Sequence, residues 1–117
     1  MTNNVRRITV LTGIALLLVT VATPAFAQFF RTDTVLAYDT DTWRVWAPSG
    51  QTRVVVNGDG DTDLDCWVYD RFGRLLGSDT DATDLCIMQF RNPTGGDLTI
   101  RIQNLGDVYN RYDLEVD

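Results

Sequence analysis

The sequence contains no histidine and no lysine, and it has only two cysteines. Histidine is the commonest general base of enzymes, and a serine or cysteine nucleophile needs such a base beside it. Two cysteines without histidine also do not complete an ordinary structural zinc site. Paired aspartates could build a glycosidase, but a domain this small offers little cleft for a sugar chain. These absences predict that the protein is not an enzyme.

The first 27 residues have the three parts of a secretory signal peptide. A polar start with two arginines precedes an almost entirely apolar run over residues 8–22, and Ala25-Phe26-Ala27 fits a cleavage site. The apolar run is shorter than the roughly 20 residues that cross a bilayer, which disfavours an uncleaved membrane anchor. We therefore expect a mature chain that begins at Gln28, has no membrane span and is secreted or periplasmic. The arginine pair leaves general and twin-arginine export both open.

The expected mature part, residues 28–117, is strongly acidic. It holds eight arginines against all sixteen acidic residues, a net charge of −8. Such a domain repels phosphate backbones and anionic membrane surfaces, so neither nucleic acid nor a membrane is an expected partner. The charge instead favours cations and basic protein surfaces.

Apolar residues of the mature chain recur with a period of two, and no stretch shows helical periodicity with caps. Residues 64–68, 98–102 and 112–116 are clear examples, and glycine- and asparagine-containing turns separate such runs. Six to eight short strands at this spacing predict an all-β sandwich or small barrel, formed by residues 42–117 as a single domain. Residues 28–41 are the least patterned, and we expect an N-terminal arm or a first edge strand there.

Cys66 and Cys86 are the two cysteines of the sequence. An even count in a small exported domain favours a disulfide, with two separate buried thiols as the alternative. Cys66 alternates in phase with Leu64, and Cys86 alternates in phase with Met88. If both strand faces point into one core, the two sulfurs can meet, so we predict a Cys66–Cys86 bond.

Residues 54–65, VVVNGDGDTDLD, form an acidic turn that leads into WVYD at residues 67–70 and a glycine-containing hairpin, GRL, at residues 73–75. Two later strands follow, LTIRI at residues 98–102 and VYNRYDL at residues 108–114. Together these pieces resemble the pre-peptidase C-terminal domains of bacteria. The resemblance implies a jelly-roll-like antiparallel β-sandwich of about seven or eight strands. It also implies an accessory module beside a secreted peptidase, and some members of that family bind calcium or substrate.

Aspartates are concentrated in two short clusters, one before and one after the predicted hairpin. Their members are Asp59, Asp61, Asp63 and Asp65 in the first cluster and Asp79, Asp81 and Asp84 in the second. Calcium prefers six to eight oxygen ligands, many of them carboxylates. The spacing is not that of an EF-hand, because the glutamate required at the twelfth loop position is missing. The alternative role is turn formation and solubility. We predict a weak calcium site formed by Asp63 and Asp65 together with one or more of Asp79, Asp81 and Asp84.

Three aromatic residues, Trp46, Trp67 and Tyr69, are candidate ligand contacts. Trp67 and Tyr69 lie on one face of a predicted strand. Exposed aromatic rings stack on sugar rings or on peptides, whereas the alternative is cross-strand packing on the outside of the sheet.

The function expected from the sequence is a secreted, non-catalytic accessory or binding module with calcium as its candidate cofactor. Its expected partner is a secreted peptidase, another extracellular protein or a polysaccharide. The alternative is a structural or assembly component of the cell envelope or of an extracellular complex. Self-association of the pure protein would favour that alternative.

Overall fold

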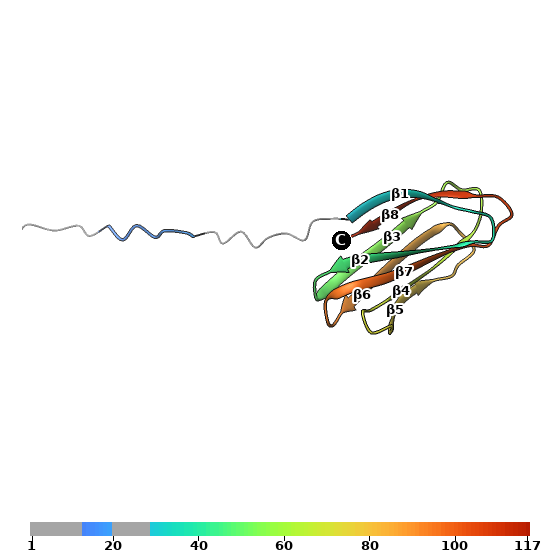
Figure 1. The fold of residues 1–117 in the computed structure, drawn as a ribbon. Helices are drawn as coiled ribbons and strands as arrows, with labels where there is room; N and C mark the ends of the chain where they lie inside the picture. Colours follow the sequence, from blue (N-terminus) through green and yellow to red (C-terminus); the bar gives the residue numbers. More distant parts are fainter. Residues whose placement is uncertain (1–12, 20–28) are drawn as a thin grey trace, which may run out of the picture.

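The computed structural model describes residues 13–19 and 29–117 (Figure 1). The described residues contain eight strands and no helix, and so include no helix that could cross a membrane. The strands are β1 (Phe29–Val35), β2 (Thr40–Ala47), β3 (Gly50–Asn57), β4 (Leu64–Tyr69), β5 (Leu75–Asp79), β6 (Leu85–Asn92), β7 (Gly96–Asn104) and β8 (Asn110–Val116). The predicted cleavage site after Ala27 and the expected N-terminus at Gln28 lie outside the described residues.

The strands form two antiparallel four-stranded sheets that pack face to face. The first sheet has the order β1-β8-β3-β6, and the second has the order β2-β7-β4-β5. This is the order of an eight-stranded jelly roll, in which most consecutive strands cross from one sheet to the other. The predicted all-β, jelly-roll-like antiparallel sandwich is therefore confirmed.

The period of two in the sequence has its cause in the packing of the two sheets. In β4, Leu64, Cys66 and Val68 are buried, and the residues between them are half-buried on the outer face. β7 and β8 show the same alternation. Successive side chains of a strand point to opposite faces, so each strand gives one apolar row to a common core.

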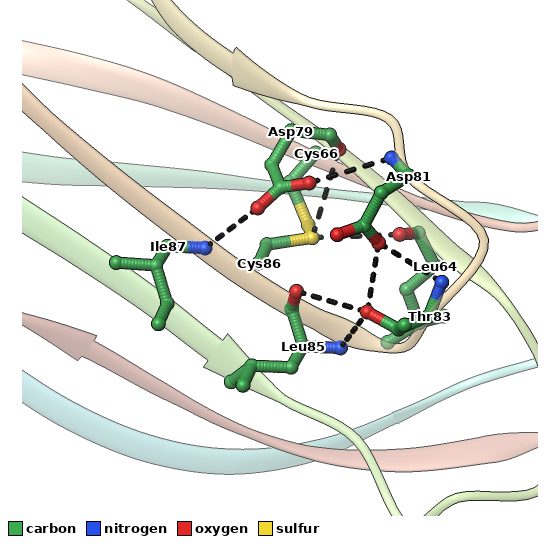
Figure 2. The surroundings of a disulfide bond; sticks show 8 residues. All are labelled: Leu64, Cys66, Asp79, Asp81, Thr83, Leu85, Cys86 and Ile87. Carbon is green, nitrogen blue, oxygen red and sulfur yellow. Dashed lines mark hydrogen bonds between the residues drawn. A yellow bond between two sulfur atoms is a disulfide. The ribbon is translucent and has the colours of Figure 1, made fainter.

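A disulfide between Cys66 of β4 and Cys86 of β6 joins the two sheets through the core (Figure 2). Both cysteines are fully buried, and their Cα atoms lie 6.2 Å apart. The predicted pairing is confirmed, because both strands do turn their cysteine faces inward.

The poorly patterned segment at residues 28–41 contains β1 and the beginning of β2. β1 is an edge strand that pairs only with β8, from Phe29 opposite Val116 to Val35 opposite Asn110. Most of its side chains are exposed, whereas Phe29 packs edge-on against the ring of Trp43. An edge strand held mainly by its hydrogen-bond ladder needs few buried side chains, which explains its weak alternation in the sequence.

The connections between the strands gather at two ends of the sandwich (Figure 1), and these ends differ in charge. One end, called here the acidic end, consists of the connections at residues 36–39, 58–63, 80–84 and 105–109. These connections hold seven of the sixteen acidic residues and no arginine. The opposite end, called here the hairpin end, consists of the connections at residues 48–49, 70–74 and 93–95, which are shorter on average and contain two arginines and one aspartate.

Candidate functional site

The acidic end brings together aspartates from both clusters of the sequence. Loss of contact with water raises the pKa of Asp63, and the charges of Asp81 and Asp84 raise it further. The pKa of Asp65 is raised in the same way, first by desolvation and then by Asp63, Asp79 and Asp81. The backbone NH of Gly58 donates to the Asp84 carbonyl at 2.9 Å, and that of Leu64 donates to the Thr83 carbonyl at 3.2 Å, so the two clusters lie close in space.

Several of these carboxylates are already used to build the loops. Asp84 Oδ2 accepts hydrogen bonds from the backbone NH of Gly60 at 2.6 Å and from Asn110 Nδ2 at 3.0 Å. Asp59 Oδ1 accepts one from the backbone NH of Asp61 at 3.0 Å. These contacts are the turn-forming role that short acidic side chains commonly take.

Figure 2 shows Asp79 and Asp81 beside the disulfide, where both accept hydrogen bonds from nearby residues. Asp79 Oδ2 accepts a hydrogen bond from the backbone NH of Ile87 at 3.0 Å. Asp81 Oδ1 accepts hydrogen bonds from the hydroxyl of Thr83 at 2.7 Å and from its backbone NH at 2.9 Å, and these lower the pKa of Asp81. The second cluster thus stabilises the β5–β6 loop.

Asp63, in the β3–β4 loop, and Asp65, near the start of β4, differ from the other aspartates of the two clusters. The Oδ1 atom of each is buried and has no hydrogen-bond partner. A buried carboxylate oxygen without a partner is costly, and a bound cation would satisfy it. Within the described residues, however, no three acidic or cysteine side chains converge as a metal site. Calcium binding therefore stays a prediction. Asp63 and Asp65 are the candidate ligands that still have a buried oxygen without a partner.

The acidic end also exposes large apolar side chains, which the sequence reasoning missed. We call this set the loop patch: Leu36, Tyr38, Leu105, Val108 and Tyr109. Tyr38 is 70% exposed and Tyr109 is 58% exposed. The signal in the sequence was the presence of tyrosines and aliphatic residues inside turn segments, where polar residues are more usual.

Asn104, a fully buried residue at the end of β7, holds the loop patch in place. Its Nδ2 donates hydrogen bonds to the carbonyl oxygens of Leu36 at 3.2 Å and Val108 at 2.8 Å. Its Oδ1 accepts one from the NH of Gly106 at 2.9 Å, and the NH of Tyr38 donates to the Gly106 carbonyl at 3.1 Å. The β1–β2 and β7–β8 loops are therefore tied to each other and to the core.

Tyr38 has an unusual backbone conformation. Its φ is +58°, and it is the only non-glycine residue with a positive φ in the described part of the chain. Bulky side chains avoid this region, at a cost of about 1–3 kcal/mol. The turn is closed by a hydrogen bond from the NH of Asp39 to the carbonyl of Leu36 at 3.1 Å. An exposed tyrosine held in a strained turn is a candidate contact residue.

The candidate aromatic residues all point outward from the second sheet. Trp67 and Tyr69 lie half-buried on β4, and Trp46, on β2, is 60% exposed. β7 runs between the two strands and places Arg101 opposite Trp67. The structure therefore puts the three rings on one face of the sheet, with the side chains of β7 between them.

A shallow hollow of about 340 Å³ lies on the same face, near the hairpin end. Its lining residues are Arg44, Trp46, Arg71, Gly96, Asp97 and Thr99. Gly96 has a φ of +101°, and a Cβ atom at this position would come within 3.0 Å of Arg71 Cδ. The glycine therefore allows the Arg71 side chain to lie across the start of β7.

Comparison with known proteins shows that a solved structure shares the fold of this chain. No family model and no curated protein sequence matches the chain, so the resemblance to pre-peptidase C-terminal domains stays a prediction. A solved structure of Aeromonas hydrophila PliG, a periplasmic lysozyme inhibitor of g-type lysozyme, is similar with a TM-score of 0.57. Its sequence identity is 18%, over 77% of this chain and 84% of that chain.

Two further solved structures that match are also of periplasmic inhibitors of g-type lysozyme. A mutant of the Escherichia coli PliG-Ec inhibitor matches 81% of this chain and 90% of its own, and Salmonella Typhimurium PliG matches 77% and 86%. Both have a TM-score of 0.48 and 14% identity. At such low identity, the likeness to the Aeromonas protein establishes a shared β-sandwich fold, and function has to be argued from the surface of this chain.

Proposed function

We propose that the mature domain is an exported, non-catalytic module that binds a secreted protein through its acidic end. The observation that carries this proposal is the loop patch, in which two tethered loops expose apolar side chains among carboxylates. An exposed apolar patch with a polar rim is typical of a surface that binds another protein.

The loops present their tyrosines in a fixed arrangement. Asn104 anchors both loops from the core, so Tyr38 and Tyr109 lose little freedom when a partner binds. Tyrosine is enriched among the residues that dominate binding energy, because it offers a large rigid surface with one polar tip. Asp39 and Asp107 lie in the same two loops and favour a partner with a basic surface.

A g-type lysozyme is the first partner to test, because the Aeromonas hydrophila protein of similar fold is an inhibitor of that enzyme. A secreted peptidase is the second, because of the resemblance to pre-peptidase C-terminal domains. Both are proteins that an exported domain would meet outside the cytoplasm.

The experiment measures binding of the mature domain to immobilised g-type lysozyme, together with the residual lytic activity of the enzyme. We expect Tyr109→Ala to weaken binding at least about tenfold, the effect of removing one hot-spot residue. Phe72→Ala is the matched control, because Phe72 is also 58% exposed but lies at the hairpin end, and it should leave affinity unchanged.

Equal affinities of the Tyr109→Ala and Phe72→Ala variants would contradict a binding surface at the acidic end. If lysozyme does not bind, binding of the wild type and of the same two variants is measured against a panel of secreted peptidases. Light scattering tests the alternative function, an assembly component. If the wild type forms a stable oligomer and Tyr109→Ala is a monomer, the loop patch is a self-association surface.

We also propose that calcium binds weakly at Asp63 and Asp65, because each has a buried oxygen without a partner. With a Kd on the order of 10⁻³ M, about 10 mM calcium would raise the free energy of unfolding by roughly 1.4 kcal/mol. Asp63→Asn with Asp65→Asn should remove the increase in melting temperature. Asp97→Asn with Asp107→Asn, a control of equal charge on exposed residues, should retain it. A shift no larger than magnesium produces would contradict the site.

A further inference from the structure

The hollow near the hairpin end differs in charge from the acidic end. Arg44 and Arg71 line it, together with a single acidic residue, Asp97. In the described part of the chain Arg74 pairs with Asp70, at 3.7 Å, whereas neither Arg44 nor Arg71 forms an ion pair there. The guanidinium groups of Arg44 and Arg71 therefore have no carboxylate of the described chain within salt-bridge distance.

Cationic and aromatic side chains continue across the face of the sheet beside the hollow. The strand register places Arg44 of β2 and Tyr69 of β4 on either side of Thr99 of β7. One row further along, Arg101 lies opposite Trp67. The hollow thus opens onto a surface that combines positive charge with flat aromatic rings.

The acidic end is too far away to cancel this local charge. β7 runs from Gly96 at the hollow to Asn104 at the acidic end, a length of roughly 27 Å at about 3.4 Å per residue. At physiological ionic strength, charges are largely screened beyond about 8 Å. The carboxylates of the acidic end therefore do little to offset the charge of Arg44 and Arg71, although the domain as a whole is acidic.

We propose that this hollow binds an acidic saccharide, that is, a sugar ring that bears a carboxylate. Arg44 and Arg71 offer guanidinium groups, which pair well with carboxylates. The indole of Trp46 offers a surface on which a sugar ring stacks, and Asp97 and Thr99 offer acceptors for sugar hydroxyl groups. The volume of about 340 Å³ lies at the lower end of the range for small-ligand sites.

An acidic peptide fits this hollow less well than an acidic sugar does. Peptides that bind to sheets usually add a strand to an open edge. β2 is such an edge, but the hollow is lined by outward side chains of β2 and β7, and β7 is paired on both sides. Recognition over β7 therefore has to come from side chains. Asp97 repels a purely anionic peptide chain, whereas it accepts hydrogen bonds from sugar hydroxyls.

The experiment titrates the mature domain with trigalacturonate and with its fully methyl-esterified form, by calorimetry and by nuclear magnetic resonance. We expect the esterified sugar, which lacks the carboxylates, to bind at least about tenfold more weakly. Arg44→Gln with Arg71→Gln should weaken trigalacturonate binding by a similar factor. Arg91→Gln with Arg111→Gln removes the same charge from exposed positions on the first sheet and should leave affinity within twofold.

Three outcomes would overturn the proposal: no binding of trigalacturonate at millimolar concentration, equal binding of the methyl ester, or equally tight binding of a glutamate oligomer of the same charge. The last outcome would identify an acidic-peptide site instead. Thermal melts of both double variants establish that they are folded. The Tyr109→Ala variant should bind trigalacturonate like the wild type, so this site is tested separately from protein binding at the acidic end.

Discussion

The acidic end and the hairpin end are closed by different means. In the hairpin end, the carboxylate of Asp70 accepts hydrogen bonds from the backbone NH groups of Phe72 at 2.8 Å and Arg74 at 2.9 Å, so the short turn stabilises itself. The loops of the acidic end combine local bonds, such as those from Thr83 to Asp81, with tethers from Asn104 and Asn110, which lie at strand ends and are fully buried. The β1–β2 and β7–β8 loops therefore depend on tethers from the core, whereas the β4–β5 turn supplies its own hydrogen bonds.

The two ends also differ in what they can bind. The acidic end combines repelling carboxylates with a rigid apolar patch, which suits a basic protein surface. The face near the hairpin end combines aromatic rings with arginines that have no carboxylate partner within the described residues, which suits a small anionic ligand. One sandwich can therefore carry two surfaces of opposite charge, and each prediction below tests how independent the two ends are.

Removal of the disulfide should have the largest effect. The cysteines are 20 residues apart in sequence, and loss of a constraint of this length costs about 3 kcal/mol in the chain-entropy model. For a domain of this size, Cys66→Ala with Cys86→Ala should lower the melting temperature by roughly 12 to 24 °C. Differential scanning calorimetry measures this shift.

The same double variant tests whether the disulfide serves mainly the acidic end. Cys86 lies opposite Val56, close to the β3–β4 loop. Hydrogen exchange should therefore increase in residues 58–63 and 80–84 before it increases in residues 70–74. Uniform loss of protection at both ends would show that the disulfide stabilises the two ends equally.

Two buried asparagines allow a direct comparison between the ends. Asn104 makes well-formed hydrogen bonds at the acidic end, whereas Asn92 Nδ2, at the hairpin end, reaches the carbonyls of Ala47 at 3.5 Å and Pro48 at 3.3 Å. The Oδ1 of Asn92 is buried and has no partner. We expect Asn104→Ala to cost about 3 kcal/mol, from several good hydrogen bonds, and Asn92→Ala about 1 kcal/mol.

Urea unfolding of the two asparagine variants measures both costs. Asn104→Ala should also weaken partner binding at the loop patch, because it releases both loops, whereas Asn92→Ala should not. If the two variants lost equal free energy of unfolding, or bound the partner equally well, Asn104 would not stabilise the loop patch more than Asn92 stabilises the hairpin end.

The sequence predicts the parts of this molecule that depend on local alternation, and it misses the parts that depend on distant contacts. The inward rows of β4, β7 and β8 follow from the period of two, and so do the disulfide and the outward direction of Trp67 and Tyr69. The position of β1 does not follow, since an edge strand is specified by its partner β8. The tether at Asn104 does not follow either, because nothing local shows that one side chain reaches two loops.

The candidate calcium residues show the same limit at the level of single atoms. The sequence indicates that the two aspartate clusters come together, because they flank the strands of the disulfide. It does not reveal that the carboxylates of Asp79, Asp81 and Asp84 accept hydrogen bonds from nearby donors. Only the folded backbone determines which carboxylate oxygens remain without a partner.

The smallest expected effect is a pH dependence of stability at the acidic end. Asp63 and Asp65 have pKa values raised above their ordinary value of 3.8, first by desolvation and then by neighbouring carboxylates. The native state therefore binds their protons more tightly than the unfolded state does. Their contribution to stability is fully present below pH 3.8 and is lost as the pH rises through the raised values. At pH 7, Asp63→Asn with Asp65→Asn should thus stabilise the domain by roughly 0.5 kcal/mol, the scale of exposed charge interactions.

Asp81 supplies a control of opposite sign from the same loops. Its pKa is lowered from 3.8 by the two hydrogen bonds from Thr83, so its contribution is present above pH 3.8 and is lost as the pH falls through the lowered value. Asp81→Asn should therefore destabilise the domain at pH 7, and both differences from the wild type should shrink on acidification. Urea unfolding at a series of pH values measures them. If Asp81→Asn and the Asp63, Asp65 double variant changed stability in the same direction, total charge and not the local environment of each carboxylate would govern the acidic end.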